Sequence, residues 1–317
     1  MSATWTNPLI AQRADPQITL VDGRYWFTAS VPSYDAIEIR SADSIAGLST
    51  AEPKTIWHAH DKGPMSFHVW APELHLIDGR WLVYFAASER GDIWKLRMYV
   101  LECEGDNPLR DAWLERGQIA TPEEGFSLDA TPFEHHGKRY LCWAQKSPPT
   151  ESNLYLAEMA DPWTLASEPV VISRPELAWE RIGFCVNEGP ALLKRKGRVF
   201  IAYSAAATDA NYCMGLLWAD EDADLLDPKS WRKSPTPVFT TDESASQFGP
   251  GHNSFTTTPD GQTDLLVYHA RNYRDIVGDP LNDPNRHTRV QAFGWRADGF
   301  PDFGTPVADG PYSIYST

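Results

Sequence analysis

The chain contains 317 residues, 42% of them hydrophobic and 12% aromatic, which is enough for a full core in one large domain or two ordinary ones. Its net charge of −15 disfavours nucleic acid and an anionic membrane as partners, and it suits a neutral ligand. No apolar run approaches the roughly 18 residues of a membrane span, and the four cysteines include no CxxC pair that would predict a zinc ribbon.

The N-terminal segment MSATWTNPLI lacks the basic and apolar regions of a secretory signal peptide. Two localisations therefore remain open. The protein is either cytoplasmic, with reduced thiols, or secreted, with its signal peptide absent from this sequence.

Five segments of the chain repeat one pattern, in which a strand, a glycine-containing turn and a second strand rich in Tyr, Trp, Phe and Val predict a β-hairpin. In chain order they cover residues 15–30, 71–88, 128–144, 187–206 and 251–270. Their turn glycines are Gly23, Gly79, Gly137, Gly197 and Gly261, which are separated by 56, 58, 60 and 64 residues. A further apolar strand follows the hairpins, as in AIEIRSADS and KLRMYVLECE.

A fixed period with about four short strands per unit is typical of a β-propeller. Five units predict an all-β, five-bladed β-propeller that occupies residues 1–317 as a single domain. The alternative is a β-sandwich with coincidental hairpins, which five in-phase turns disfavour. Helical periodicity is weak throughout, and only residues 222–231 predict a short helical turn.

Acidic residues recur at the start of the first strand of these hairpins. Counted back from the turn glycine of its own hairpin, Asp15 and Asp129 lie eight residues before it, and Glu188 and His252 lie nine before it. For Glu188 we expect a turn that is one residue longer. Because the first strand of each propeller blade lines the central channel, these four side chains are predicted to converge at one mouth of it.

The second hairpin has Ala71 at this position, with Glu73 two residues further on. A single carboxylate at a strand start is commonly a turn or cap residue, and Asp15-Pro16 alone resembles a turn opener. Carboxylates in the same phase of three units favour a functional cluster instead, because clustered acids carry an electrostatic cost.

The order of the units indicates a mechanism. Asp129 and Glu188 lie in adjacent units and cannot both ionise easily, so the pKa of one is raised and it remains a general acid near neutral pH. Asp15 lies across the mouth with room for a water molecule. An acid that faces a base over about 6.5–9.5 Å is the arrangement of inverting glycoside hydrolysis.

The motifs RADPQITLVDGRYWFTAS, SFHVWAPELHLIDGRWLVYFAAS, SLDATPFEHHGKRYLCWA, VNEGPALLKRKGRVFIAYSAA, GPGHNSF and DPNRHTRVQAFGW resemble those of glycoside hydrolase family 43. The resemblance covers about residues 7 to 310 and is greatest for the α-L-arabinofuranosidase branch, including exo-acting enzymes on α-1,5-linked arabinan. It implies a five-bladed propeller with Asp15 as general base and Glu188 as general acid. Asp129 would orient Glu188 and raise its pKa.

The resemblance also implies ligand contacts. His252 matches a histidine beside a calcium ion in the channel, although Ca²⁺ requires several oxygen ligands that one histidine does not supply. Arg289 matches an arginine that reaches the sugar pocket, with a salt bridge within the acidic mouth as the alternative, and both can hold. Trp70 matches an aromatic residue of the pocket, with core packing as the alternative. No organic cofactor is expected.

These features predict a monomeric, inverting, exo-acting α-L-arabinofuranosidase that releases arabinose from an arabinose-containing oligosaccharide or polysaccharide. Residues 272–287 are long enough to wall off one end of the cleft, which favours exo action. The alternatives are an endo-arabinanase or β-xylosidase of the same fold, and a non-catalytic sugar-binding propeller. Three in-phase acids disfavour the last, because binding alone does not require them.

Overall fold

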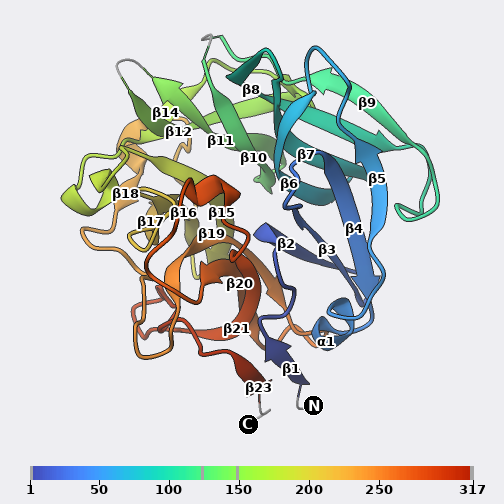
Figure 1. The fold of residues 1–317 in the computed structure, drawn as a ribbon. Coiled ribbons are helices and arrows are strands. Elements are labelled where there is room, and N and C mark those ends of the chain that lie inside the picture. Colours follow the sequence, from blue (N-terminus) through green and yellow to red (C-terminus); the bar gives the residue numbers. More distant parts are fainter. Residues whose placement is uncertain (1–2, 123–124, 148–149, 315–317) are drawn as a thin grey trace.

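The computed structural model describes residues 3–122, 125–147 and 150–314. It contains five antiparallel sheets around a central axis, which confirms the predicted five-bladed propeller (Figure 1). The strands of each sheet pair in chain order, except that the strand Val170–Ser173 of the third sheet pairs with Glu151–Asp161. The innermost strands β2, β6, β10, β15 and β19 contact their neighbours in turn, and β19 returns to contact β2.

The blades divide the chain into five consecutive segments. Blade one contains β2 (Ala14–Val21), β3 (Arg24–Ser30), β4 (Ala36–Ala42) and β5 (Lys54–His58). Blade two contains β6 (Phe67–Ile77), β7 (Arg80–Glu89), β8 (Asp92–Cys103) and β9 (Trp113–Gln118). Blade three contains β10 (Ser127–His135), β11 (Lys138–Ser147), β12 (Glu151–Asp161), β13 (Thr164–Leu165) and β14 (Val170–Ser173). Blade four contains β15 (Asn187–Arg195), β16 (Arg198–Ala205), β17 (Cys213–Asp220) and β18 (Arg232–Lys233). Blade five contains β19 (Phe248–Thr257), β20 (Asp264–Arg271), β21 (His287–Trp295) and β22 (Pro301–Asp302).

Helical structure in the described residues is confined to short turns in the connections. They are α1 (Ile45–Leu48), η1 (Ala178–Arg181), η2 (Pro228–Ser230) and η3 (Pro280–Asn282). η2 lies within the predicted turn at residues 222–231. Among the described residues, no helix has the length and apolar character that a membrane span requires.

The hairpin turns confirm the sequence pattern in four blades and correct one expectation. Four turns consist of two residues with positive φ, as a type I′ turn requires, and the second residue is always glycine. The turn of blade four is one of these, at Lys196-Gly197, so the expectation of a longer turn there is wrong. Only the turn of blade five is longer, because Thr257 pairs with Asp264 across it.

Every innermost strand carries a β-bulge at the same position, where two of its residues oppose one residue of the second strand. The first residue of each bulge has a left-handed backbone, with φ between 44° and 57°; these residues are Asp15, Ala71, Asp129, Gly189 and His252. Asp and His tolerate positive φ better than most residues, and glycine adopts it freely. Because a bulge redirects side chains, this repeated irregularity explains why a carboxylate stands at a strand start.

Glu188 therefore occupies a different position from the one that counting predicted. The bulge of blade four begins at Gly189, and Glu188 is the paired residue before it, opposite Ser204. Its equivalents in blades two and three are Trp70 and Leu128.

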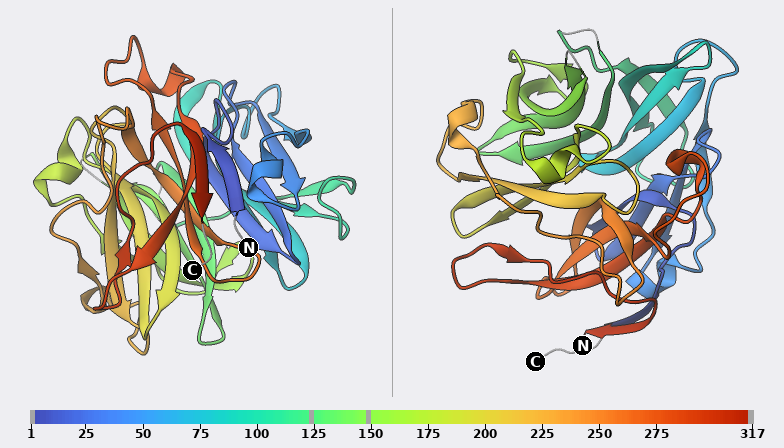
Figure 2. Two further views of the ribbon diagram at one scale, coloured as in Figure 1. Left: turned by 90° about the horizontal axis from the view of Figure 1, so that it is seen from below. Right: turned by 60° about the vertical axis from the view of Figure 1, so that its left-hand side comes forward.

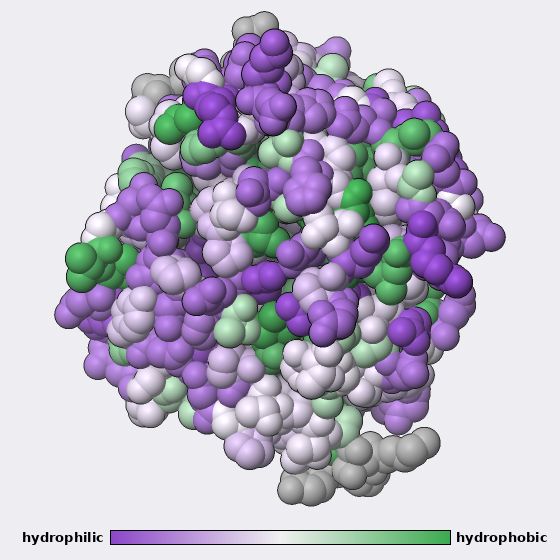
Figure 3. Space-filling model, turned by 45° about the vertical axis from the view of Figure 1, so that its right-hand side comes forward, coloured by the Kyte–Doolittle hydropathy of each residue, from purple (hydrophilic) through white to green (hydrophobic). Residues whose placement is uncertain are grey.

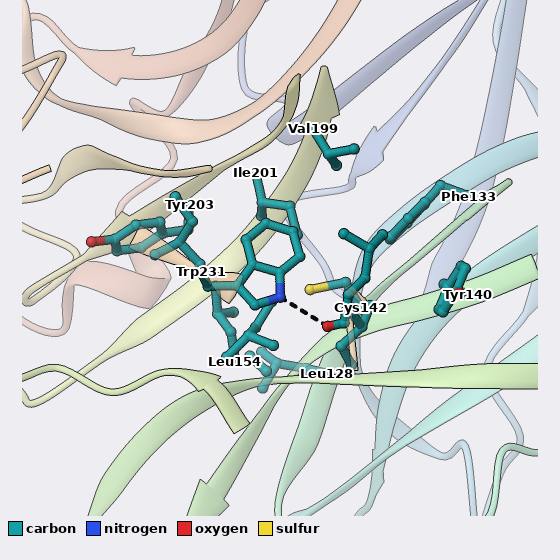
Figure 4. Close-up of a cluster of buried hydrophobic side chains, with 14 of the residues drawn as sticks. Leu128, Phe133, Tyr140, Cys142, Leu154, Val199, Ile201, Tyr203 and Trp231 are labelled. Atoms are coloured by element: carbon teal, nitrogen blue, oxygen red, sulfur yellow. Dashed lines mark hydrogen bonds between the residues drawn. The ribbon is translucent and has the colours of Figure 1, made fainter. Parts of the chain in front are cut away.

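Apolar side chains fill the contacts between neighbouring blades. Figure 4 shows the cluster between blades three and four, where Trp231 packs among residues such as Ile201 and Leu154 and donates its indole N–H to the Leu225 carbonyl at 2.9 Å. Leu128 and Tyr203 of this cluster adjoin Asp129 and Ser204 in the chain. The acidic bulges are thus set in a packed scaffold.

The two ends of the described chain pair as a two-stranded ribbon, β1 (Ala3–Asn7) with β23 (Gly310–Ile314), outside the five blades (Figure 2). The ribbon is anchored on blade five, since the side chains of Trp5 and Asn7 both donate to the Val290 carbonyl at 2.9 Å. The outer face shown in Figure 3 is largely hydrophilic, with hydrophobic residues scattered among polar ones.

Candidate active site

One cavity of about 550 Å³ lies at the bulged ends of the innermost strands. Its lining includes Asp15, Asp129, Glu188 and His252, which come from four different blades. The structure therefore brings together the four side chains that sequence phase predicted to converge. Asp129 is only 1% exposed, which places it in a low-dielectric environment.

Asp15 is surrounded by groups that stabilise its charge. The Ser30 hydroxyl donates to Oδ2 at 2.5 Å. Oδ1 lies 3.4 Å from Nδ1 of His252 and 3.5 Å from Nη1 of Arg286. Burial alone would raise the pKa of Asp15, but the charges of His252 and Arg286 outweigh it and hold that pKa well below its usual range. Asp15 is thus an ionised carboxylate.

His269 orients Asp15 through the backbone. The amide N–H of Asp15 donates to Nδ1 of His269 at 3.0 Å, so that nitrogen is unprotonated and the ring is the Nε2–H tautomer. Burial lowers the pKa of His269 well below its usual range, in agreement with a neutral ring. The positive charge beside Asp15 therefore comes from His252 and Arg286.

The surroundings of Asp129 and Glu188 favour the protonated form of the carboxyl group instead. Burial raises the pKa of Asp129, and the neighbouring charge of Glu188 raises it further. Burial likewise raises the pKa of Glu188. Oδ2 of Asp129 accepts the backbone N–H of Gly189 at 2.9 Å, which fixes the chain next to Glu188. Asp129 is buried and Glu188 is partly buried, and two such neighbouring carboxyls titrate as a pair that retains a proton to higher pH than either would alone.

His252 carries positive charge at the centre of this cluster. It is 9% exposed. Burial lowers its pKa, but Asp15, Asp129 and Glu188 together raise it above the usual value. The imidazolium offsets the negative charge that three carboxyl groups would otherwise concentrate in one cavity.

His252 by itself supplies no oxygen ligand to the calcium site that the resemblance implied. Ca²⁺ takes 6–8 oxygen ligands at about 2.3–2.6 Å. Within the described ranges, no group of three or more His, Cys, Asp or Glu side chains could hold a metal ion. Nδ1 of His252 instead faces the Asp15 carboxylate. Calcium in the channel stays a prediction, and the mechanism below is derived from the side chains of this chain.

Arg289 does not reach the cavity, in contrast to the sequence-based expectation. Its side chain is fully buried and pairs with Asp309 through Nε at 3.0 Å, so it forms a salt bridge, but not within the acidic mouth as the alternative had it. Arg286, three residues earlier in the same motif, lines the cavity and faces Asp15. Arg289 lies within β21, paired with Tyr268, whereas Arg286 directly precedes that strand.

Trp70 lies where the resemblance placed it. Its side chain lines the cavity and also belongs to the buried cluster between blades, so Trp70 is part of both the pocket and the core. Its indole N–H is buried without a hydrogen-bond partner among the described residues. His68 stacks on the indole with ring centroids 4.4 Å apart.

Sequence reasoning missed several residues of the cavity. Tyr212 lines the cavity and donates its hydroxyl to Oε1 of Glu188 at 2.6 Å. Trp94 and Phe184 also line the cavity, although they are 56% and 64% exposed. The sequence feature that could have identified Tyr212 is its position at the start of the apolar segment YCMGLLWADED, which follows the fourth hairpin.

Comparison with known proteins gives consistent results. Residues 5–301 match the model of Glycosyl hydrolases family 43. The chain is 57% identical over 312 residues to an extracellular exo-α-(1→5)-L-arabinofuranosidase of Streptomyces avermitilis, a match that covers 98% of this chain and 65% of that relative. It is 54% identical over 281 residues to a protein of the same name from Streptomyces chartreusis, covering 88% of this chain and 86% of that one.

A solved structure is also similar. The crystal structure of an α-L-arabinofuranosidase from Lactobacillus brevis superposes with a TM-score of 0.93 at 57% identity, covering 96% of this chain and 98% of that one. The chain spans just under two thirds of the length of the Streptomyces avermitilis relative. Because the family match extends over most of its length, the chain belongs to Glycosyl hydrolases family 43.

Proposed function

We propose that this protein is an exo-acting α-L-arabinofuranosidase that hydrolyses terminal arabinofuranosyl residues with inversion of configuration. The observation that carries the proposal is the contrast between the acids of one cavity. Asp15 is held ionised by His252 and Arg286, whereas the pair Asp129 and Glu188 retains a proton. A base and an acid in one pocket are what single-displacement hydrolysis requires.

In this mechanism Asp15 acts as general base. Its carboxylate accepts a proton from a water molecule as the water oxygen attacks the anomeric carbon. Ser30 and the backbone bond to His269 orient the carboxylate. The low pKa of Asp15 keeps it ionised down to acidic pH, so the base is available wherever the acid is protonated.

Glu188 acts as general acid. It donates its proton to the glycosidic oxygen as the bond to the anomeric carbon breaks, so the leaving group departs as an alcohol and Glu188 becomes ionised. Asp129 positions Glu188 through the N–H of Gly189. The charge of Glu188 raises the pKa of Asp129, and because this repulsion is mutual it favours one proton on the pair, which the mechanism assigns to Glu188.

Two buried polar atoms of the cavity lining support a sugar ligand. Oδ1 of Asp129 and Nε1 of Trp70 have no hydrogen-bond partner among the described residues. Unsatisfied buried groups carry a cost of about 1–3 kcal/mol, which a ligand offsets by supplying partners. One acceptor and one donor match the hydroxyl groups of a sugar.

Exo action is supported by the segment from Asp279 to Leu281, which forms η3 and lines the cavity. It belongs to the long connection between β20 and β21 that sequence analysis predicted to wall off the cleft. Arabinose-containing chains as the substrate, and α-1,5 links in particular, are inferred from the relatives named above.

The printed names of both Streptomyces relatives also describe extracellular enzymes. They support the secreted alternative of the two localisations. Assay of arabinofuranosidase activity in the culture medium and in cell extract of the source organism tests this point.

A substrate panel tests the proposed function. The protein is incubated with linear α-1,5-arabinan, arabinoxylan, an aryl α-L-arabinofuranoside and an aryl β-D-xyloside, and products are separated over the first minutes. Arabinose as the first product from arabinan is expected, and the Glu188→Gln variant is the control for contaminating activity. Early mixed oligosaccharides would instead identify an endo-arabinanase. Preference for the xyloside would identify a xylosidase, and no turnover of any substrate a binding protein.

A further inference from the structure

Tyr212 occupies a special position in the cavity, since its phenol lies against the residue assigned as general acid. It is 1% exposed, and its hydroxyl donates to Oε1 of Glu188 at 2.6 Å. Among the described residues no other side chain forms a hydrogen bond with Glu188. Burial and the charge of Glu188 raise the pKa of Tyr212 well above its usual value, so the phenol remains a donor.

The direction of this hydrogen bond is fixed by the groups behind it. The backbone N–H of His252, which can only donate, points at Oγ of Ser204 at 2.7 Å. Ser204 also lowers the pKa of Tyr212, as a hydroxyl that points its proton at the phenol oxygen would, although burial outweighs this effect. Because Ser204 Oγ already accepts the N–H of His252, we infer that its own proton is directed to the Tyr212 oxygen. The phenol proton is then directed to Glu188.

The space for the Tyr212 ring is created by glycine. A Cβ atom at Gly251 would lie 2.5 Å from the ring carbon Cε1 of Tyr212 and 3.0 Å from Ser204 Oγ. Any larger residue there would displace the ring. On another side the ring stacks on His269, with an interplanar angle of 3° and centroids 5.8 Å apart. The phenol is thus held in one orientation, beside the histidine that also orients Asp15.

We propose that Tyr212 is a positioning residue for the general acid, and that it determines which carboxyl oxygen of Glu188 carries the catalytic proton. Oε1 is occupied as an acceptor of the phenol proton, so the acid proton resides on Oε2. Tyr212 also stabilises the carboxylate that forms when the proton leaves. This inference rests on the proposed role of Glu188.

The same contact affects the pH dependence. Asp15 of β2, Asp129 of β10, His252 of β19 and Arg286 before β21 also act on the charge of Glu188, and none of them changes when only the phenol oxygen is removed. A hydrogen bond to a charged carboxylate is stronger than one to a neutral carboxyl, and the difference corresponds to about one pKa unit. Loss of the phenol hydroxyl should therefore raise the pKa of Glu188 by about one unit.

The test compares Tyr212→Phe with Tyr203→Phe by pH profiles of kcat/KM on arabino-oligosaccharides and on an aryl arabinofuranoside. Tyr203 is a matched control, because it is equally buried and its hydroxyl donates to another carboxylate, Glu180, at 2.8 Å. In Tyr212→Phe we expect the basic limb to move up by about one pH unit. The kcat on oligosaccharides should fall more than the kcat on the aryl substrate, because a poor leaving group depends more on the acid. Tyr203→Phe should leave the basic limb in place.

The variants distinguish a failure of this inference from a failure of the proposed function. A basic limb that stays in place in Tyr212→Phe, while Glu188→Gln is inactive on oligosaccharides, would overturn the inference but not the proposed function. A Glu188→Gln enzyme that hydrolyses oligosaccharides normally would overturn the proposed function itself. If Tyr212→Phe does not fold, Ser204→Ala replaces it. Loss of the Ser204 donor should move the limb up by a smaller amount, and a limb that does not move would again contradict the inference.

Discussion

The acidic side chains of the cavity differ in function because their neighbours differ. Asp15 has two cationic neighbours and a hydroxyl donor. Asp129 has one backbone donor and lies beside Glu188, so its burial is not offset to the same extent. Carboxyl groups at the same or adjacent positions of the repeat thus give an ionised carboxylate in blade one and a proton-retaining pair in blades three and four.

The first prediction concerns Asp129. In Asp129→Asn the repulsion on Glu188 is lost, so the pKa of Glu188 falls and the basic limb of the pH–rate profile moves to lower pH. This direction is opposite to that expected for Tyr212→Phe. The measurement is kcat/KM between about pH 4 and 9, and a limb that moves upward would contradict the assigned coupling.

The second prediction concerns the charge on His252. This charge lowers the pKa of Asp15, Asp129 and Glu188, so in His252→Asn all three should rise. The acidic limb reports Asp15 and the basic limb reports Glu188, and both should therefore move to higher pH.

Chelation provides the control for this interpretation of His252. Prolonged incubation of the wild-type protein with EDTA should leave its profile unchanged, because the positive charge beside Asp15 is assigned to the imidazole of His252 itself. Activity that EDTA removes and added Ca²⁺ restores would show that the positive charge in the cavity belongs to a metal.

At the scale of the element, the repeated bulge connects fold and site. Each innermost strand has a residue with a left-handed backbone at the same position of its bulge. That residue carries a carboxylate only in blades one and three, and it is a glycine in blade four. Gly189 allows the bulge without strain. It also leaves room for His252, since a Cβ at Gly189 would lie 3.3 Å from Cγ and Nδ1 of that ring.

The third prediction compares two glycines with positive φ. Gly189→Ala and Gly79→Ala should each lose about 1–2 kcal/mol of stability, because both force an L-residue into the left-handed region. Gly79 has no atom within 4 Å of the added Cβ, so its variant should retain full kcat. Gly189→Ala should lose kcat as well, through displacement of His252 and Glu188. Equal kcat in the two variants, measured with their unfolding curves, would refute this account of the bulge.

Sequence reasoning could find the propeller, because type I′ turns leave a visible glycine at a fixed period. It also found the acids, whose phase relative to that glycine is visible. The bulge itself leaves no such mark, since Asp, Ala, Gly and His all occupy it, and so Glu188 was assigned to the wrong register position. The same limit applies to Arg286 and Arg289. They lie in one motif, and only the start of β21 determines that the first enters the cavity and the second is buried.

For the whole molecule, stability depends on closing the ring of blades. The terminal ribbon joins both ends of the described chain to blade five, and Trp5 is its buried anchor, 3% exposed and in ring contact with Tyr312 at 5.1 Å. The clusters between blades one and five include side chains from this ribbon. The active site, in contrast, lies at the bulged ends of the innermost strands.

The fourth prediction follows from this separation. Trp5→Ala should lower the free energy of unfolding by about 3–5 kcal/mol, the usual cost of truncating a buried tryptophan. At temperatures where the variant stays folded, its kcat/KM should match the wild type. The exposed Trp94→Ala is the control for stability and should unfold as the wild type does. Loss of kcat/KM in fully folded Trp5→Ala would indicate that the ribbon also shapes the site.

The central claim is that Asp15 and the Asp129–Glu188 pair hydrolyse the glycosidic bond in one displacement by water. Proton NMR of the first arabinose released from an α-1,5-linked arabino-oligosaccharide, recorded before mutarotation, tests it most directly. The account predicts that the β-anomer appears first and the α-anomer only later, by equilibration. An α-anomer present from the start would contradict it, because retention requires a covalent intermediate and a nucleophile in place of the base Asp15.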